Sequence, residues 1–135
     1  MWSKEYRIDT PASPETLWAL FEKVNDWGRW NAGIEHIKLD GPFATGSTFF
    51  MKPPGMDGFV SRLSQVDALR GFTDITELDG LTITVNHLIT RVSEQLTQVS
   101  YAIQVQGDNA REVGEAISGD FPDVLRALVE LAEQG

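Results

Sequence analysis

Two side chains that can hold or move a proton occur in segments that otherwise alternate apolar and polar residues. His87 lies in the predicted strand 81–91, and Tyr101 lies in the predicted strand 99–105. The odd-numbered positions of both strands carry the apolar residues, so both side chains fall on the apolar face. An imidazole or a phenol in such surroundings can hydrogen-bond the carbonyl or hydroxyl of a ligand, or act in acid–base catalysis. We therefore take both as candidate catalytic residues.

The same two side chains also have a purely structural interpretation. A buried histidine is commonly satisfied by a nearby hydroxyl, here Tyr101, or by a backbone carbonyl. A tyrosine at such a position often packs its ring and bonds locally. The sequence leaves these interpretations open beside the functional ones.

An apolar wall is predicted around His87 and Tyr101. The odd positions of the segment 46–52 should extend the concave face, with Phe50 on the outer side. Apolar surface with one or two polar groups is typical of a small-molecule pocket, although aliphatic residues of this kind also form ordinary packed cores. The candidate ligand-binding residues are Trp30, Phe49, Met51, Phe72, Val85, His87, Ile89, Val99, Tyr101, Ile103, Val113, Ile117 and Phe121.

Charged residues on the predicted strands are expected to form ion pairs at the surface rather than a functional site. Asp74 is predicted to pair with Arg62 or Arg91 near the edge of the sheet. Cross-strand pairs of this kind are usually solvated and contribute little.

Two aromatic residues and one loop residue have alternative roles. Trp27 and Trp30 resemble a binding clamp, although two tryptophans on one short turn more commonly anchor it to a sheet. Met56 lies in the loop 53–58, which is a candidate lid over the mouth of the pocket. An exposed methionine without a role explains Met56 equally well.

The elements that position these residues follow from periodicity and turn signals. A strand over 2–9 precedes Ser13, an N-cap, and Pro14, which suits the first position of a helix. A second helical turn over 25–31 leads to a run of β-strands from 34 to 105, in which Asp79-Gly80 is typical of a two-residue hairpin. A long C-terminal helix follows, with an interruption at 119–122.

Composition limits the classes of function. The chain has 135 residues, consistent with one domain over 1–135, and a net charge of −9, which disfavours binding to nucleic acid and anionic membranes. It has no cysteine and only two histidines, His36 and His87, so we expect neither a metal site nor a cofactor. We also predict no stable membrane insertion and a cytoplasmic location, because no long apolar run occurs.

The order of elements and three short motifs resemble a known superfamily. The motifs are Ser13-Pro14-Glu15-Thr16-Leu17-Trp18, Asp26-Trp27-Gly28-Arg29-Trp30 and the loop 40–47. They resemble the START-related and Bet v 1-like (SRPBCC) superfamily, in its bacterial polyketide cyclase/dehydrase-like branch. The resemblance implies an α+β helix-grip fold, in which a seven-stranded antiparallel sheet wraps around the long C-terminal helix, with two short helices after the first strand and a cavity between sheet and helix.

Three functions agree with this resemblance. The first is binding of a small, largely apolar molecule, lipid-like or polyketide-like, in the internal cavity. The second is a cyclase or dehydratase enzyme, in which His87 moves a proton and Tyr101 holds an enolate oxygen. The third is a protein-interaction module without a ligand, which predicts a silent or collapsed cavity, an exposed apolar patch and an unidentified protein partner.

Overall fold

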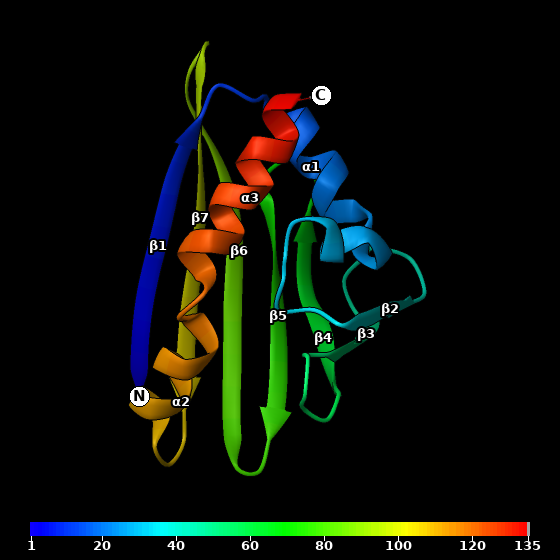
Figure 1. The fold of residues 1–135 in the computed structure, drawn as a ribbon, viewed down its shortest axis with the longest axis vertical. Coiled ribbons are helices and arrows are strands. Elements are labelled where there is room, and N and C mark those ends of the chain that lie inside the picture. The colour runs from blue at the N-terminus through cyan, green and yellow to red at the C-terminus, as the bar shows by residue number, and fades with distance from the viewer. Residues whose placement is uncertain (135) are drawn as a thin grey trace.

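The computed structural model describes residues 1–134 and shows one curled β-sheet with helices on its concave side (Figure 1). The elements confirm the predicted helix-grip fold. In chain order they are β1 (Trp2–Thr10), α1 (Pro14–Glu22), the 3-10 helix η1 (Val24–Arg29), β2 (His36–Asp40), β3 (Thr48–Lys52), β4 (Phe59–Asp67), β5 (Gly71–Leu78), β6 (Leu81–Ser93), β7 (Leu96–Gln106), α2 (Ala110–Ser118) and α3 (Phe121–Gln134).

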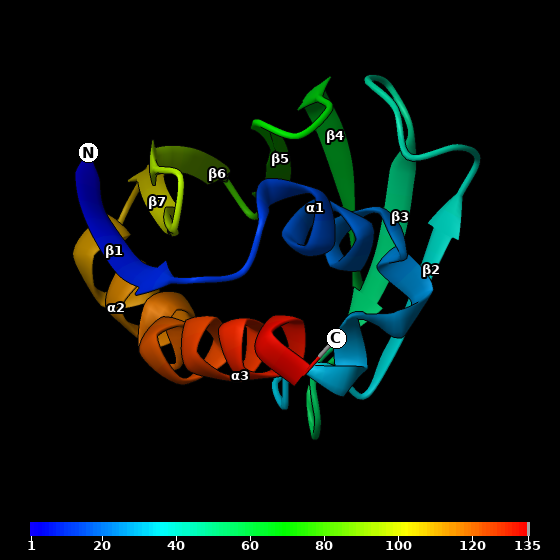
Figure 2. The same cartoon turned by 90° about the horizontal axis from the view of Figure 1, so that it is seen from above.

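The seven strands form an antiparallel sheet in the order β1-β7-β6-β5-β4-β3-β2. The predicted hairpin is present between β5 and β6, where Leu78 pairs with Leu81. Asp79 and Gly80 have φ angles of 47° and 80°, the left-handed values that a type I′ turn requires. Seen from above, the sheet bends into an open arc, and the helices lie within it (Figure 2). β5 therefore occupies the centre of this arc.

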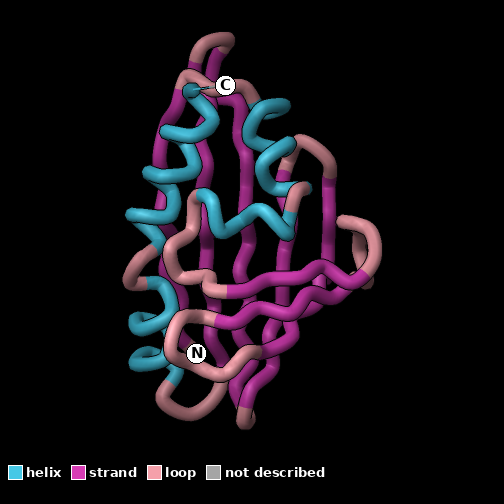
Figure 3. Tube along the Cα trace, turned by 45° about the vertical axis from the view of Figure 1, so that its right-hand side comes forward, coloured by secondary structure: helices cyan, strands magenta, loops and turns pink. Residues whose placement is uncertain are grey.

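Two short helices follow β1, as predicted: α1 begins at the predicted residue Pro14, and η1 (Val24–Arg29) overlaps the helical turn predicted over 25–31. The Ser13 hydroxyl accepts a hydrogen bond from the Thr16 amide at 3.2 Å, so it caps α1. α1 then buries Leu17 and Phe21 completely against the sheet. The following turn, η1, runs beside α1 toward β2 (Figure 3) and buries Trp27.

The C-terminal helix has the predicted interruption, but its first half packs differently from the prediction. α2 ends at Ser118, and α3 begins at Phe121. Ile117, one of the predicted ligand-binding residues, does not face the sheet, because it is 37% exposed. α2 instead buries Gly114 and Ser118.

Small residues face the sheet because α2 lies very close to β1. A Cβ atom added at Gly114 would lie 2.1 Å from the ring of Trp2, so no larger residue fits there. One turn further on, the hydroxyls of Ser118 and Tyr6 form a hydrogen bond of 2.9 Å. The larger Val113 is only partly buried. Close approach therefore reverses the usual rule that the large residues of a helix define its buried face.

α3 packs in the conventional way and closes the core. Its buried face carries Val124, Leu125, Leu128, Val129 and Ala132. The carboxylate of Glu133 accepts a hydrogen bond of 2.8 Å from Thr10, which ties the end of α3 to the end of β1. Among residues 1–134, no helix combines the length and apolar character needed to span a membrane.

Candidate functional site

The inner face of the sheet is mostly apolar, and a group of titratable side chains lies near its centre. Register brings them together: Phe72 pairs with His87, Asp74 pairs with Val85, and His87 pairs with Tyr101. Asp74, His87 and Tyr101 thus come from three neighbouring strands, β5, β6 and β7, and all three are buried. We call these three residues the polar cluster.

His87 is held firmly by its neighbours. Its ring stacks on the ring of Phe72, with centroids 4.0 Å apart and planes 10° apart, and the ring of Tyr101 meets it edge-on at 4.5 Å. Its Nδ1 atom lies 3.3 Å from the carbonyl oxygen of Phe72. Burial lowers the pKa of His87 to about 3, and the bond to the Phe72 carbonyl opposes this only in part. The imidazole is therefore neutral at neutral pH.

Asp74 is the member of the cluster that the sequence analysis placed wrongly. It lies in the central strand rather than at an edge, points inward and is only 9% exposed, whereas Arg62 and Arg91 are exposed. Its Oδ2 atom lies 3.7 Å from Nε2 of His87. Burial raises the pKa of this carboxyl to about 7, because the charged form loses its hydration. Asp74 therefore changes charge close to neutral pH.

Tyr101 completes the cluster with an unused hydroxyl. Its ring also contacts Phe121 of α3 edge-on at 5.5 Å, but among the described residues its buried hydroxyl has no hydrogen-bond partner. Burial and the nearby charge of Asp74 both raise the pKa of the phenol above its ordinary value, so it is un-ionised. Buried polar atoms without a partner are uncommon in folded proteins, so this hydroxyl marks the polar cluster as the candidate site.

The inner face becomes more open toward the β5–β6 turn. Next to Asp74 on β5, Thr76 is buried and its hydroxyl hydrogen-bonds that of Ser61. Two residues further along the same face, Leu78 is 39% exposed, and its partner Leu81 is partly buried. Figure 1 shows no helix in front of this end of β5 and β6, because α2 lies over β1 and β7. The apolar surface at Leu78 and Leu81 is thus open to solvent, and the buried residues Thr76, Ile83 and Val85 separate it from the polar cluster.

The opposite end of the inner face is filled by aromatic rings. Phe21 of α1 meets Phe72 edge-on at 5.1 Å, and Trp27 stacks on the other side of Phe72 at 5.5 Å. The indole N–H of Trp27 donates to the carbonyl of Phe21 at 2.9 Å, and Trp30 packs against Trp27. Both tryptophans therefore anchor η1 rather than form an open clamp. We call Phe21, Trp27, Trp30, Phe49 and Phe72 the aromatic layer.

An enclosed cavity between sheet and helix stays a prediction. The rings of Phe21, Phe72, His87, Tyr101 and Phe121 form a continuous series of contacts across the space assigned to it. A surface hollow of about 830 Å³ lies elsewhere, between the start of α1, the β4–β5 turn and the end of β6. Ile89 is the one predicted ligand-binding residue that lines it.

The structure places most predicted ligand-binding residues on the inner face, and their role in binding stays a prediction. Met51, Val113 and Phe121 are partly buried, Ile117 is exposed, and Met56 of the predicted lid loop is 63% exposed. The buried members are Trp30, Phe49, Phe72, Val85, His87, Ile89, Val99, Tyr101 and Ile103.

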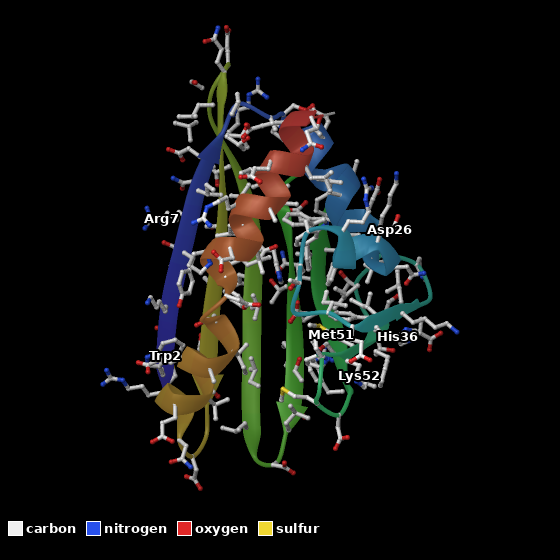
Figure 4. All side chains as sticks on the ribbon, in the orientation of Figure 1. Trp2, Arg7, Asp26, His36, Met51 and Lys52 are labelled. Carbon is white, nitrogen blue, oxygen red and sulfur yellow. The ribbon has the colours of Figure 1, made fainter. Side chains whose placement is uncertain are left out.

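Other polar and charged side chains lie away from the cluster. Figure 4 shows Arg7 on β1 and, at the far edge of the sheet, His36 and Lys52. Lys52 bonds Glu35 at 2.7 Å, and His36 is exposed beside Phe50, which faces outward as predicted. Within residues 1–134, no three histidine, aspartate or glutamate side chains are grouped as metal ligands would be.

A curled antiparallel sheet around a bent C-terminal helix defines the START-related and Bet v 1-like class, which confirms the resemblance read from the motifs. A family model described as "Polyketide cyclase / dehydrase and lipid transport" matches residues 1–133, and the chain belongs to this family. The fold is therefore one associated with hydrophobic ligands. A comparison with curated proteins found no sequence that matches the chain significantly.

Solved structures with the same fold share little sequence identity with this chain. A START superfamily protein from Mycobacterium smegmatis has 14% identity and a TM-score of 0.77, covering 98% of this chain and 97% of its own. Norcoclaurine synthase from Thalictrum flavum, solved with dopamine and hydroxybenzaldehyde, has 11% identity and a TM-score of 0.76, covering 98% and 87%. The di-domain ARO/CYC BexL of the BE-7585A biosynthetic pathway has 15% identity and a TM-score of 0.78, covering 98% and 47%.

Proposed function

We propose that this protein binds a small, largely apolar molecule on the inner face of its sheet, with one polar group of the ligand at the polar cluster. The observation that carries this proposal is the buried Tyr101 hydroxyl, which has no partner within the described residues and lies near the Asp74 carboxyl. A ligand oxygen placed there would remove the cost of an unpaired buried group.

The rest of the ligand would contact the apolar surface between the cluster and the β5–β6 turn. Leu78 and Leu81 lie at the exposed end of this surface, and the side chains of Asp74 and His87 keep 13% and 10% of their area exposed. These values support access from the side of the β5–β6 turn. An apolar surface with few, convergent polar groups is the usual chemistry of a small-molecule site.

Titration of the labelled protein with fatty acids, sterols, flavonoids and aromatic polyketides, followed by amide NMR, tests this proposal. We expect saturable shifts at Leu81, Val85 and Tyr101. Tyr101→Phe should weaken binding roughly three- to tenfold, since a lost hydrogen bond is worth about 1 kcal/mol.

Tyr6→Phe is the matched control, because Tyr6 pairs with Tyr101 in the sheet but already bonds Ser118. It should leave affinity unchanged. If no compound of the panel shifts the inner face, the binding proposal fails, and the exposed neighbouring residues Phe50 and Val60 on the outer face become the place to look for a protein partner.

A second candidate function is catalysis of ring closure in a poly-ketone, and the Asp74–His87 pair favours it. A carboxyl with a pKa of about 7 can both take and return a proton at neutral pH. Asp74 would remove a proton from the carbon next to a carbonyl, and the C–H electron pair would form the enolate, whose oxygen Tyr101 would hydrogen-bond. The enolate carbon would then attack a second carbonyl of the same chain, and the resulting alkoxide would regain the proton from Asp74.

Asp74→Asn separates the two functions, because the side chain keeps its size but can no longer take up a proton. Loss of turnover with a reactive poly-ketone, beyond its slow uncatalysed cyclisation, would support the enzyme. A change in affinity without any turnover by the parent protein would leave binding as the function.

A further inference from the structure

The polar cluster has a defined arrangement of hydrogen-bond donors and acceptors. The carbonyl of Phe72 can only accept, so Nδ1 of His87, at 3.3 Å, carries the proton. The neutral ring then presents the lone pair of Nε2 toward Oδ2 of Asp74, at 3.7 Å. Two acceptors facing each other in a buried site repel, and this repulsion is removed when the Asp74 carboxyl carries a proton. The arrangement therefore favours a neutral Asp74.

No cation is available to balance a negative charge at this site. The chain has 11 lysines and arginines, all within the described residues, and none is buried. Lys52, the one that is not fully exposed, is bound to Glu35. A ligand carboxylate or phosphate at the cluster would be desolvated beside a carboxyl group and without a counter-charge, which is strongly unfavourable.

We infer that the polar cluster selects a neutral ligand whose polar group accepts hydrogen bonds, such as a ketone or aldehyde carbonyl, over a carboxylate or phosphate of the same skeleton. This inference rests on the proposed binding function and narrows its ligand class. The donor is the free hydroxyl of Tyr101 on β7, and the neutral Asp74 carboxyl on β5, whose one proton faces Nε2 of His87, offers nothing that attracts an anion. Free fatty acids, with an anionic head group, become poor ligands even though their chains are apolar.

A matched pair of probes tests the inference. 2-Acetylnaphthalene and 2-naphthoate share an aromatic skeleton and differ in whether the polar group is neutral or anionic. At pH 7 we expect the ketone to bind at least about tenfold more tightly, measured by amide NMR at Val85 and Ile103. Equal affinities, or tighter binding of the carboxylate, would overturn the charge selection but leave the binding function standing. If neither probe nor any other apolar compound binds, both fail.

Asp74→Asn provides a second readout at pH 8.5, because it keeps the size of the side chain and cannot ionise, whereas Asp74, with a pKa of about 7, is ionised at this pH. At pH 8.5 the preference for the ketone should be at least about threefold lower in this variant than in the parent protein, since the carboxylate no longer meets a like charge. Asp123→Asn, on the exposed side of α3, is the matched control and should keep the parent preference. An unchanged preference in a folded Asp74→Asn variant would also overturn the inference.

Discussion

The aromatic layer and the polar cluster lie side by side on the same sheet face, and they differ in whether their buried polar atoms have hydrogen-bond partners. In the aromatic layer the buried indole N–H of Trp27 has a partner at 2.9 Å, and rings contact rings on all sides of Phe72. In the polar cluster the Tyr101 hydroxyl is unpaired, and among residues 1–134 no hydrogen bond reaches the Asp74 carboxyl. Phe72 and His87 join the two regions through one ring stack.

This difference separates a region that stabilises the fold from one that costs stability. Full packing and satisfied polar groups are what folding alone favours. Unpaired buried polar groups lower stability, so proteins retain them mainly at functional sites, where another molecule uses them. The comparison therefore supports the polar cluster, rather than the aromatic layer, as the functional part of the inner face.

The largest expected effect tests the aromatic layer. Phe21→Ala should lower the free energy of unfolding by about 3–5 kcal/mol, because Phe21 is fully buried and contacts Trp30 and Phe72. Urea unfolding followed by tryptophan fluorescence measures this loss. Val92→Ala, at an exposed site on β6, is the control and should change little. A loss for Phe21→Ala no larger than that of the control would show that the layer is loosely packed.

An intermediate effect, with a defined pH dependence, tests the polar cluster. The pKa of Asp74 is raised from 3.8 to about 7, so the folded protein binds this proton more tightly than the unfolded chain does. As pH rises between these two values, ionisation of Asp74 therefore lowers the free energy of unfolding. The pKa of His87 is lowered from 6.5 to about 3, so its contribution to stability rises with pH over nearly the same range. In the parent protein the two contributions oppose each other.

Asp74→Asn should remove the unfavourable contribution alone. As pH rises from 4 to 7, the free energy of unfolding of the variant should increase relative to that of the parent protein, by an amount on the order of a few kcal/mol. Above this range the difference should stay constant. Urea unfolding at pH 4, 5.5, 7 and 8.5 measures it. A stability difference independent of pH would mean that Asp74 ionises normally in the folded protein.

The smallest expected effect distinguishes two tyrosines that face each other in the sheet. Tyr101→Phe should be neutral or slightly stabilising, because it removes an unpaired hydroxyl, whereas Tyr6→Phe should cost about 1 kcal/mol by breaking the bond to Ser118. Thermal unfolding of both variants measures the difference. Equal losses would indicate that the Tyr101 hydroxyl is paired after all, for example with bound water.

Much of the fold could be predicted from local signals. Alternation placed His87 and Tyr101 on the inner face, Ser13 and Pro14 marked the start of α1, and Asp79-Gly80 marked the hairpin. These features depend on a few neighbouring residues, so periodicity and turn chemistry are sufficient.

The missed features depend on distances between elements. The alternation of Phe72, Asp74 and Thr76 indicates one face of a strand, but the residue type of Asp74 suggested a solvated ion pair, and only the sheet order shows that β5 is central. Ile117 was misplaced because periodicity does not show how closely α2 approaches Trp2. The open end of the inner face at Leu78 likewise follows from where α2 lies, which no local pattern contains.

The pairing of β1 with β7 has a consequence for how this protein folds. Trp2 lies opposite Val105, so within residues 1–134 the first strand pairs with the last one and with no other. Joining segments that are far apart in sequence costs loop-closure entropy and slows folding. During synthesis, β1 leaves the ribosome before β7 and stays unpaired until β7 has emerged. Completion of the sheet is therefore expected to be a late step in folding, and the unpaired edge of β7 is prone to aggregation until then.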